Sequence, residues 1–210
     1  MKKIGVLALQ GAVSEHIAML GNIGFSGVPV RCAEDLVGLS GLILPGGEST
    51  AISRLIRRKE LADPIRAFAA EMPVLGTCAG MILCAKEARG SGGVLPGQDE
   101  GAEAEAAVET THEITGELVS LGLIDVAVKR NGFGRQVDSF ETALDIPGIG
   151  EGVPAVFIRA PYVEKTGKSV TVLAEYEGKA VMAQSGNVTV TAFHPELADD
   201  LRIFRHVFGR

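Results

Sequence analysis

Short apolar runs separated by helix-like segments dominate the first 87 residues of this 210-residue chain. The runs, each four to six residues long, cover residues 4–9, 28–31, 41–44 and 73–77. A short continuous apolar run is typical of a strand buried on both faces of a sheet. The spacing of apolar residues and the capping signals between the runs predict helices over residues 14–24, 49–58, 61–71 and 79–87, the first with Ser14 as its N-cap. This alternation predicts an α/β fold built on a doubly wound, mostly parallel sheet.

The second half of the chain is expected to contain mainly strands. They are predicted over residues 122–129, 135–140, 155–158, 170–176, 180–184 and 188–193. Glu177-Gly178 and Ser185-Gly186-Asn187 supply the turns of two hairpins. Residues 199–208 are predicted to form the last helix. Because no internal repeat or linker divides the sequence, we expect residues 1–210 to form a single domain.

Residues 90–120 differ in composition from the rest of the chain. They carry seven acidic residues and neither Lys nor Arg, and Glu105, Glu109, Glu113 and Glu117 recur at every fourth position. Like charges along one helix face repel one another, so we expect an acidic insertion at the surface. Its simplest interpretation is a tolerated loop. The insertion accounts for the net charge of -6, because the remainder has 19 acidic and 20 basic residues.

Charge and cysteine content narrow the class of function. With a net charge of -6, the chain has no global positive field that would attract nucleic acid or an anionic membrane, so small molecules or proteins are the expected partners. Cys32, Cys78 and Cys84 do not suggest a disulfide framework, and their spacing is not that of a metal site. The first apolar run is too short for a signal peptide, and no run is long enough to span a bilayer. We expect a cytoplasmic protein.

The segment Gly76-Thr77-Cys78-Ala79-Gly80 joins a predicted buried strand to a predicted helix. This G-x-C-x-G pattern is the cysteine counterpart of the nucleophile elbow of serine hydrolases. Small residues on both sides permit a tight turn and the approach of a substrate, and the start of the following helix favours a thiolate. Cys78 is therefore a candidate nucleophile. The alternative is an inert cysteine buried in a glycine-bounded turn.

His194 and Glu196 are candidates for the remainder of a catalytic triad. His194 follows the predicted strand 188–193, at the carboxyl edge where open α/β sheets place their sites. Glu196 is spaced to bond the imidazole nitrogen that faces away from the thiol, as the third member of a triad does. The alternative is a turn whose glutamate caps the last helix. A surface or interhelical role is expected for the other histidines, His16, His112 and His206.

The segment Pro45-Gly46-Gly47-Glu48-Ser49 also lies between a predicted strand and a predicted helix. Its glycines expose backbone N–H groups that suit a tetrahedral oxyanion, and they permit a peptide flip that would make the oxyanion hole conditional. The alternatives are a phosphate-binding loop and a simple turn. A nucleotide-binding P-loop is disfavoured because the G-x-x-x-x-G-K-[ST] pattern is missing.

Taken together, these motifs resemble the class I, triad-type glutamine amidotransferase family. Four further segments resemble the glutaminase subunits of pyridoxal 5'-phosphate synthase within it: L-Q-G-A at 9–12, L-P-G-G-E-S-T at 44–50, R-N-G-F-G-R-Q-V-D-S-F at 130–140 and F-I-R-A-P at 157–161. The implied fold is a flavodoxin-like, three-layer structure in which helices flank an open, mostly parallel sheet.

The resemblance implies a reaction in which L-glutamine and water give L-glutamate and ammonia. Cys78 would form a γ-glutamyl thioester, His194 would move the protons and Glu196 would orient His194. The N–H groups of Gly47 and Ala79 would hold the oxyanion. The implied substrate-binding residues are Gly47, Glu48, Ser49, Arg130, Ile158 and Arg159. No metal or cofactor is implied.

The resemblance also implies a partner. Glutaminases of this kind pass ammonia to a separate synthase subunit and gain activity on docking to it, which fits a conditional oxyanion hole. Gln10 is the candidate for sensing the contact, and the alternative is an amide that caps a loop. The acidic insertion would be a flap near the glutamine entrance or at the rim of the synthase contact. Two other functions stay open: a glutaminase that serves a different synthase, and a catalytically silent regulatory subunit.

Overall fold

A computed structural model describes residues 1–89, 118–133 and 139–209. Its helices are α1 (Val13–Asn22), α2 (Ser49–Arg58), α3 (Ala62–Glu71), α4 (Ala79–Cys84) and α5 (Arg202–Phe208), with the short 3-10 segments η1 (Ala33–Leu36) and η2 (Pro195–Leu197). Its strands are β1 (Lys3–Leu7), β2 (Ser26–Val30), β3 (Gly41–Leu44), β4 (Val74–Thr77), β5 (Ala85–Arg89), β6 (Ile124–Lys129), β7 (Ser139–Ile146), β8 (Gly150–Ile158), β9 (Tyr162–Thr166), β10 (Thr171–Tyr176), β11 (Lys179–Ser185) and β12 (Val188–Thr191).

The central sheet has the strand order β2-β1-β3-β4-β12-β11-β9-β6-β5, and β10 pairs with β11. All neighbours from β2 to β12 are parallel. From β12 to β6 each neighbouring pair is antiparallel, and β5 and β6 are again parallel. The alternation of the first 87 residues therefore correctly predicted the parallel half of the sheet.

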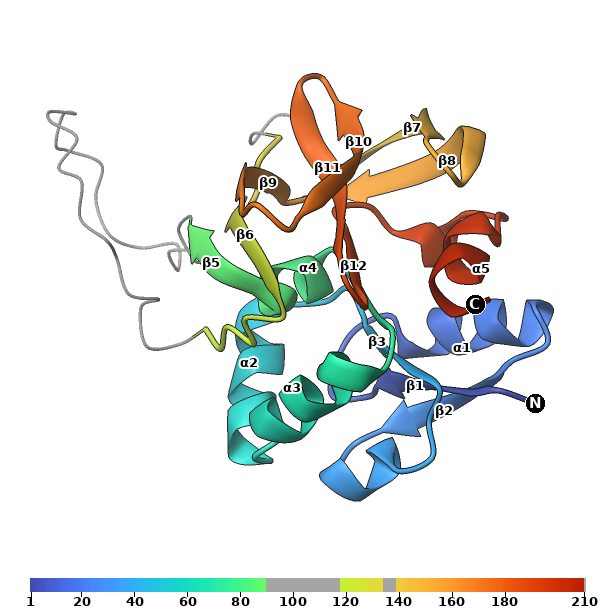
Figure 1. Ribbon diagram of the computed structural model, residues 1–210, viewed down its shortest axis with the longest axis vertical. Helices are drawn as coiled ribbons and strands as arrows, with labels where there is room; N and C mark the ends of the chain where they lie inside the picture. The colour runs from blue at the N-terminus through green and yellow to red at the C-terminus, as the bar shows by residue number, and fades with distance from the viewer. Residues whose placement is uncertain (90–117, 134–138, 210) are drawn as a thin grey trace, which may run out of the picture.

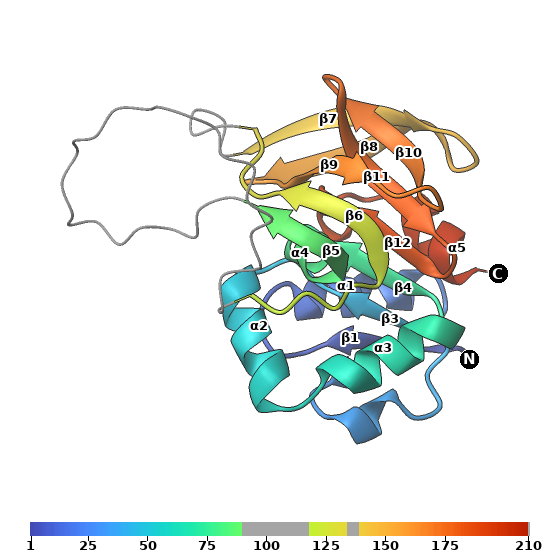
Figure 2. The same ribbon diagram turned by 60° about the vertical axis from the view of Figure 1, so that its left-hand side comes forward.

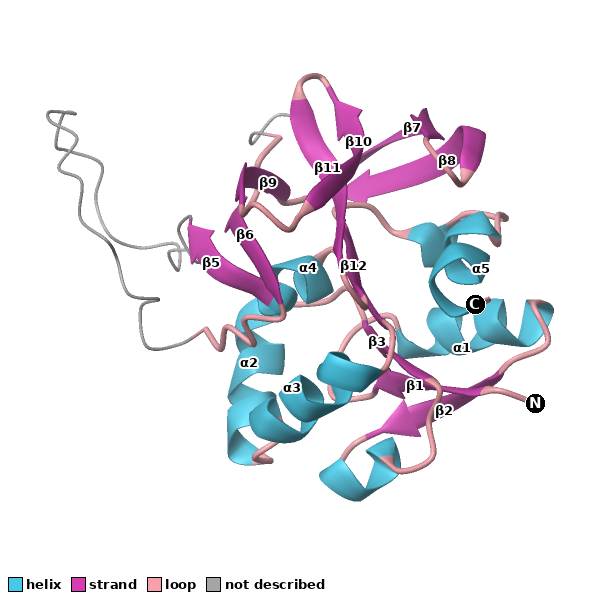
Figure 3. Ribbon diagram, in the orientation of Figure 1, coloured by secondary structure: helices cyan, strands magenta, loops and turns pink. Residues whose placement is uncertain are grey.

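Helices cover both faces of this parallel half. Figure 1 shows α2 and α3 on one side of β1 and β3, and α1 and α5 on the other. Every residue of β3, β4 and β12 is buried, as expected for strands covered on both faces. Figure 3 shows that helices gather around this half, whereas the opposite end of the molecule consists of strands. The predicted three-layer α/β fold is confirmed.

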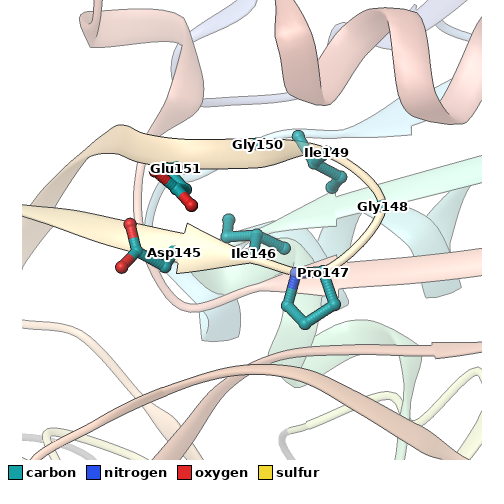
Figure 4. A pocket seen from close by; sticks show the side chains of 7 residues that line it. All are labelled: Asp145, Ile146, Pro147, Gly148, Ile149, Gly150 and Glu151. Carbon is teal, nitrogen blue, oxygen red and sulfur yellow. The ribbon is translucent and has the colours of Figure 1, made fainter.

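The β7–β8 hairpin packs on the strand-rich end beside β10 (Figure 2). Aromatic rings hold it there: the Phe140 ring stacks on Tyr176 of β10 with centroids 5.0 Å apart, and the centroids of Phe157 and Phe193 lie 5.6 Å apart. The residues that line an open hollow at the tip of this hairpin are Asp145, Ile146, Pro147, Gly148, Ile149, Gly150 and Glu151 (Figure 4). None of the candidate site residues lines this hollow.

The predicted helix 79–87 is too long. Helix α4 ends at Cys84, and residues 85–89 form β5, which pairs with β6 from Ala85 opposite Ile124 to Arg89 opposite Lys129. The sequence A-K-E-A-R has good local helix propensity, but pairing with a distant strand outweighs it. Because β6 lies more than 30 residues further along the chain, no local signal predicted this strand.

The start of α1 also differs from the prediction. Ser14 is not the N-cap: its hydroxyl donates to the Glu15 carboxylate at 3.0 Å, and Ala12 is the capping residue, without a side-chain hydrogen bond. The Ala12 N–H instead donates to the carbonyl of Gly46 at 3.1 Å. A contact with a distant loop, rather than a local cap, therefore fixes where this helix begins.

In the second half, both hairpin turns are where the sequence predicted them. Glu177, Gly178 and Gly186 all have positive φ, the conformation that tight hairpin turns require. Strand β9 was not predicted, and β7 and β8 extend beyond the predicted segments. Residues 135–138 of the predicted strand 135–140, and most of the predicted insertion at 90–120, lie outside the described residues. No helix in the described ranges is both long and apolar enough to cross a membrane.

Candidate active site

The candidate site lies at the carboxyl ends of four adjacent parallel strands, β1, β3, β4 and β12. Gln10 follows β1, Gly46 follows β3, Cys78 follows β4 and His194 follows β12. Parallel strands bring their carboxyl ends to one edge of a sheet, where α/β proteins place their binding sites. The motifs that the sequence singled out separately are therefore neighbours in space.

Cys78 occupies a strained turn between β4 and α4. Its φ of 49° and ψ of -102° are unusual for a residue with a side chain. The Cys78 N–H donates to the carbonyl of Thr191 at 2.8 Å, which ties the turn to β12. A Cβ atom on Gly80 would collide with the carbonyl oxygen of Leu44, and one on Gly76 would meet the backbone of Gly80. The two glycines of the motif therefore allow the turn to close against its neighbours.

Cys78, His194 and Glu196 are all buried and lie in one hydrogen-bonded line. His194 Nδ1 is 2.7 Å from Glu196 Oε1, and the imidazole also bonds the Cys78 side chain. Burial opposes the charged imidazolium, but the bonds to Cys78 and Glu196 outweigh it and raise the pKa of His194 to about 10. Burial likewise opposes ionisation of Glu196, but the His194 bond and the adjacent imidazoles lower its pKa. This arrangement stabilises a charged His194 between two acidic groups.

The loop after β3 is anchored on three sides. The Gly46 N–H donates to Thr77 Oγ1 at 3.0 Å, and the Gly46 carbonyl accepts the Ala12 N–H. Gln10 Oε1 accepts the Glu48 N–H at 2.8 Å. Gln10 thus caps the loop, as one of its two interpretations expected, while its role in sensing a partner stays a prediction. Within the described part of the chain, no acceptor is bonded to the N–H groups of Gly47 and Ala79.

Glu48 and Arg130 are close enough for their charges to interact. Glu48 caps α2, where its two carboxylate oxygens accept the N–H groups of Thr50 at 2.9 Å and Ala51 at 2.6 Å. Partial burial raises the pKa of Glu48, but these bonds, with the positive charge of Arg130, lower it overall. A carboxylate and a guanidinium at one site are suited to the ammonium and carboxylate groups of an amino acid.

The other predicted substrate-binding residues are divided between two segments. Ser49 is buried in the first turn of α2. Ile158 ends β8, and its carbonyl oxygen lies 3.9 Å from Cys78 Sγ. Arg159 is exposed and has a positive φ of 42°. The structure thus brings Ile158 to the nucleophile, whereas it shows no contact between the Arg159 side chain and the triad among the described residues.

Lys179 is a residue of this region that the sequence did not single out. Its Nζ donates to the Gly132 carbonyl at 3.1 Å and lies 4.5 Å from the centroid of the Phe133 ring. The Gly132 N–H donates to the Ala160 carbonyl at 2.9 Å. Lys179 therefore clamps the segment that carries Arg130. A lysine on a hairpin strand has no local signature of such a role, because its partner is a backbone carbonyl 47 residues away.

For the glutamine hydrolysis that the sequence resemblance implies, a Lys179→Met variant is expected to raise the KM for glutamine about three- to tenfold while kcat changes little. Methionine keeps most of the side-chain length but removes the charge that holds the Arg130 segment by one hydrogen bond and a cation–π contact, each worth about 1 kcal/mol. Steady-state ammonia release measures both constants. Lys168→Met, at an exposed position elsewhere, is the matched control. An unchanged KM in Lys179→Met contradicts the clamp.

His16 lies behind the triad and not at the surface. Its side chain is fully buried, and its Nε2 is 3.2 Å from Thr77 Oγ1 and 3.4 Å from Glu196 Oε2. The surface interpretation is therefore wrong, whereas the interhelical one holds in part, because the ring packs edge-on against Phe204 of α5. Its position along the helix could have indicated this burial, because His16 lies on the same face of α1 as the buried Met19 and Leu20.

Two histidines, His112 and His206, and the three cysteines remain to be placed. His206, on α5, is 3.3 Å from Gln184 Oε1 through its Nε2, which fits the expected interhelical or surface role. His112 lies outside the described residues. In residues 1–89, 118–133 and 139–209, no group of three or more His, Cys, Asp or Glu side chains is arranged to hold a metal ion. The three cysteines are free thiols.

Comparison with known proteins places the chain in a family. A model of the SNO glutamine amidotransferase family matches residues 6–95 and 106–210. "Pyridoxal 5'-phosphate synthase subunit PdxT" of Dehalococcoides mccartyi (strain CBDB1) is 49% identical over 97% of this chain and 94% of its own length. The protein of the same name from Shouchella clausii is 47% identical over 96% and 91%.

A solved structure agrees with these sequence matches. The crystal structure of a glutamine amidotransferase superposes with a TM-score of 0.83 at 38% identity, covering 98% of this chain and 97% of the other. The family match spans the strands and turns that carry all the candidate site residues, and residues 96–105 within the acidic segment are unmatched. The chain therefore belongs to the SNO glutamine amidotransferase family.

Proposed function

We propose that this protein is the glutaminase subunit of a pyridoxal 5'-phosphate synthase. It hydrolyses L-glutamine to L-glutamate and ammonia, and it delivers the ammonia to the synthase subunit. The observation that carries the proposal is the hydrogen-bonded line of Cys78, His194 and Glu196, in a chain whose relatives are subunits of that synthase. The free thiols support a cytoplasmic location.

The chemistry begins with Cys78. Its thiolate attacks the side-chain amide carbon of glutamine, and a carbon–sulfur bond forms while the carbonyl electrons move to oxygen. The N–H groups of Gly47 and Ala79 stabilise that oxyanion, since no acceptor among the described residues is bonded to them. His194 then gives a proton to the amide nitrogen, the carbon–nitrogen bond breaks, and ammonia leaves. The product on the enzyme is a γ-glutamyl thioester.

The second half of the reaction regenerates the thiolate. With its Nδ1 bonded to Glu196, His194 has Nε2 available on the side of the thiol. It accepts a proton from water as the water oxygen attacks the thioester carbon, and the carbon–sulfur bond breaks to give glutamate. Glu196 stabilises the imidazolium in both halves. No redox step or co-reactant other than water is required.

Glu48 and Arg130 together orient the substrate. Arg130 bonds the α-carboxylate, and Glu48 offers its remaining lone pairs to the α-ammonium. Gly47, Ser49 and the Ile158–Arg159 backbone flank the amide end beside Cys78. Because Glu48 also caps α2, substrate binding and the start of this helix share one side chain.

Amide-labelled [15N]glutamine tests the proposal directly. With the synthase subunit and its sugar phosphate substrates present, we expect labelled ammonia to be released and the label to appear in pyridoxal 5'-phosphate. Release is expected to be faster with the synthase subunit than without it. Label in ammonia but none in pyridoxal 5'-phosphate would point to a glutaminase that serves a different synthase, and no release under any condition would indicate a silent subunit.

A further inference from the structure

The buried His16 has no part in the mechanism derived above, although it contacts the triad. It stands on α1, and its Nε2 is 3.4 Å from Glu196 Oε2, the carboxylate oxygen that His194 does not use. Both side chains are fully buried. No group in the described residues forms a hydrogen bond with Glu196 Oε2, and His16 Nε2, 3.4 Å away, is the polar atom placed beside it. A buried carboxylate oxygen without a donor costs on the order of 1–3 kcal/mol, so this contact is of consequence for the triad.

The tautomer of His16 follows from the groups around its ring. A proton on Nε2 has Thr77 Oγ1 at 3.2 Å as its acceptor, and the negative charge of Glu196 Oε2 lies 3.4 Å from the same nitrogen. A proton on Nδ1 would have no acceptor, because Nδ1 is buried without a partner, and it would set the Nε2 lone pair against a carboxylate. The neutral form with hydrogen on Nε2 is therefore the favoured one.

We propose that His16 is a positioning residue of the glutaminase site: as a neutral imidazole it bonds Thr77 Oγ1 through Nε2 and places the positive end of its Nε2–H bond beside Glu196 Oε2, which holds that carboxylate ionised and aligned on His194. The inference rests on the function proposed above. Four side chains then interact in the order Cys78, His194, Glu196 and His16. His16 contacts no substrate and acts only through Glu196.

Among the described residues, His194 and Glu15 are the other titratable groups that interact with the His16–Glu196 pair. Glu196 faces His194 from its own segment and His16 from α1. His16 faces Glu196, His194 and, on its own helix, Glu15. Burial lowers the pKa of His16, with Glu196 acting against this shift and His194 acting with it, so the ring stays neutral near pH 7.

Thr77 connects this contact to the oxyanion loop. Its hydroxyl oxygen lies 3.2 Å from His16 Nε2 and accepts the Gly46 N–H at 3.0 Å. Thr77 is itself fully buried and directly precedes Cys78. The His16 ring is thus held between the triad carboxylate and the residue that anchors the oxyanion loop.

Two variants of His16 separate positioning from packing. His16→Leu keeps the approximate volume but removes the donor, whereas His16→Gln places an N–H₂ group near the original Nε2. In the complex with the synthase subunit, we expect His16→Leu to lower kcat about ten- to hundredfold with little change in KM. Loss of the donor also raises the pKa of Glu196, so the acidic limb of the kcat/KM profile moves up by about one pH unit. His16→Gln is expected to restore most of kcat and to return the acidic limb of the kcat/KM profile to its wild-type position.

The outcomes are distinguishable. If wild-type protein releases no ammonia with its partner, the proposed function fails. The fraction of His16→Leu protein that is folded is measured by the reaction of Cys78 with iodoacetamide. If activity falls only in proportion to this fraction, and the acidic limb of the kcat/KM profile does not move, His16 is a packing residue. Imidazole 15N NMR of the wild-type protein supplies a check that needs no variant: we expect a neutral ring protonated at Nε2, and an Nδ1–H tautomer or an imidazolium overturns the proposal.

Discussion

A Cys78→Ala variant is expected to lose glutamine-dependent ammonia release by on the order of 10⁴-fold or more, while it keeps its fold and its partner. Alanine fits the turn without new contacts, but no other thiol is placed to replace the nucleophile. Cys84 is fully buried, and burial raises the pKa of its thiol, so it stays protonated. Only transition-state binding by the oxyanion loop would remain.

Two controls make this result specific. Cys32→Ser alters a half-buried cysteine at the N-cap of η1, away from the triad, and is expected to leave the rate unchanged. Supplying ammonium salt in place of glutamine to the complex that contains Cys78→Ala is expected to restore pyridoxal 5'-phosphate formation. Normal ammonia release by Cys78→Ala would show that the hydrolysis does not pass through this thiol.

A Glu196→Gln variant is expected to lower kcat about 10³- to 10⁴-fold with a small effect on KM. Glutamine matches the shape of glutamate, but its N–H₂ group can donate to His194 Nδ1 and thereby select the tautomer with hydrogen on the side of Cys78. The loss of the negative charge also removes one of the two groups that raise the pKa of His194. The imidazolium therefore loses its proton at a lower pH than in the wild type.

NMR titration of His194 tests the charge effect apart from the rate. In the wild type the ring is expected to stay protonated up to a pH of about 10, and in Glu196→Gln its midpoint is expected to fall toward the ordinary value of about 6.5. Glu71→Gln, at the exposed end of α3, is the matched control. An unchanged midpoint in Glu196→Gln would show that the carboxylate does not set the protonation of His194.

The sequence could predict the parallel half of the fold, and could place the candidate triad residues at one edge of it, because contiguous segments carry both signals. The cysteine elbow, the glycine pair and the H-P-E turn each directly follow an apolar strand. Topology alone then brings the ends of parallel strands together. The relative placement of Cys78, His194 and Gly46 therefore needed no knowledge of side-chain packing.

The features that the sequence did not predict depend on partners far along the chain. Strand β5 exists because β6 pairs with it, although its own residues favour a helix. His16 and Lys179 are ordinary polar residues of a helix and a strand until their partners, Glu196 and the Gly132 carbonyl, are in place. A local pattern encodes the periodicity of an element but not which distant group a side chain will meet.

The nucleophile and its base stand on β4 and β12, which are neighbours in the sheet although more than 100 residues separate them along the chain. Closing so long a loop has an entropic cost that is met only when the sheet is nearly complete. A chain still emerging from the ribosome, or one clipped before β12, would lack both the Thr191 carbonyl that ties the Cys78 turn and the histidine that follows β12. Hydrolysis through this triad therefore requires a chain that is synthesised and folded through residue 196.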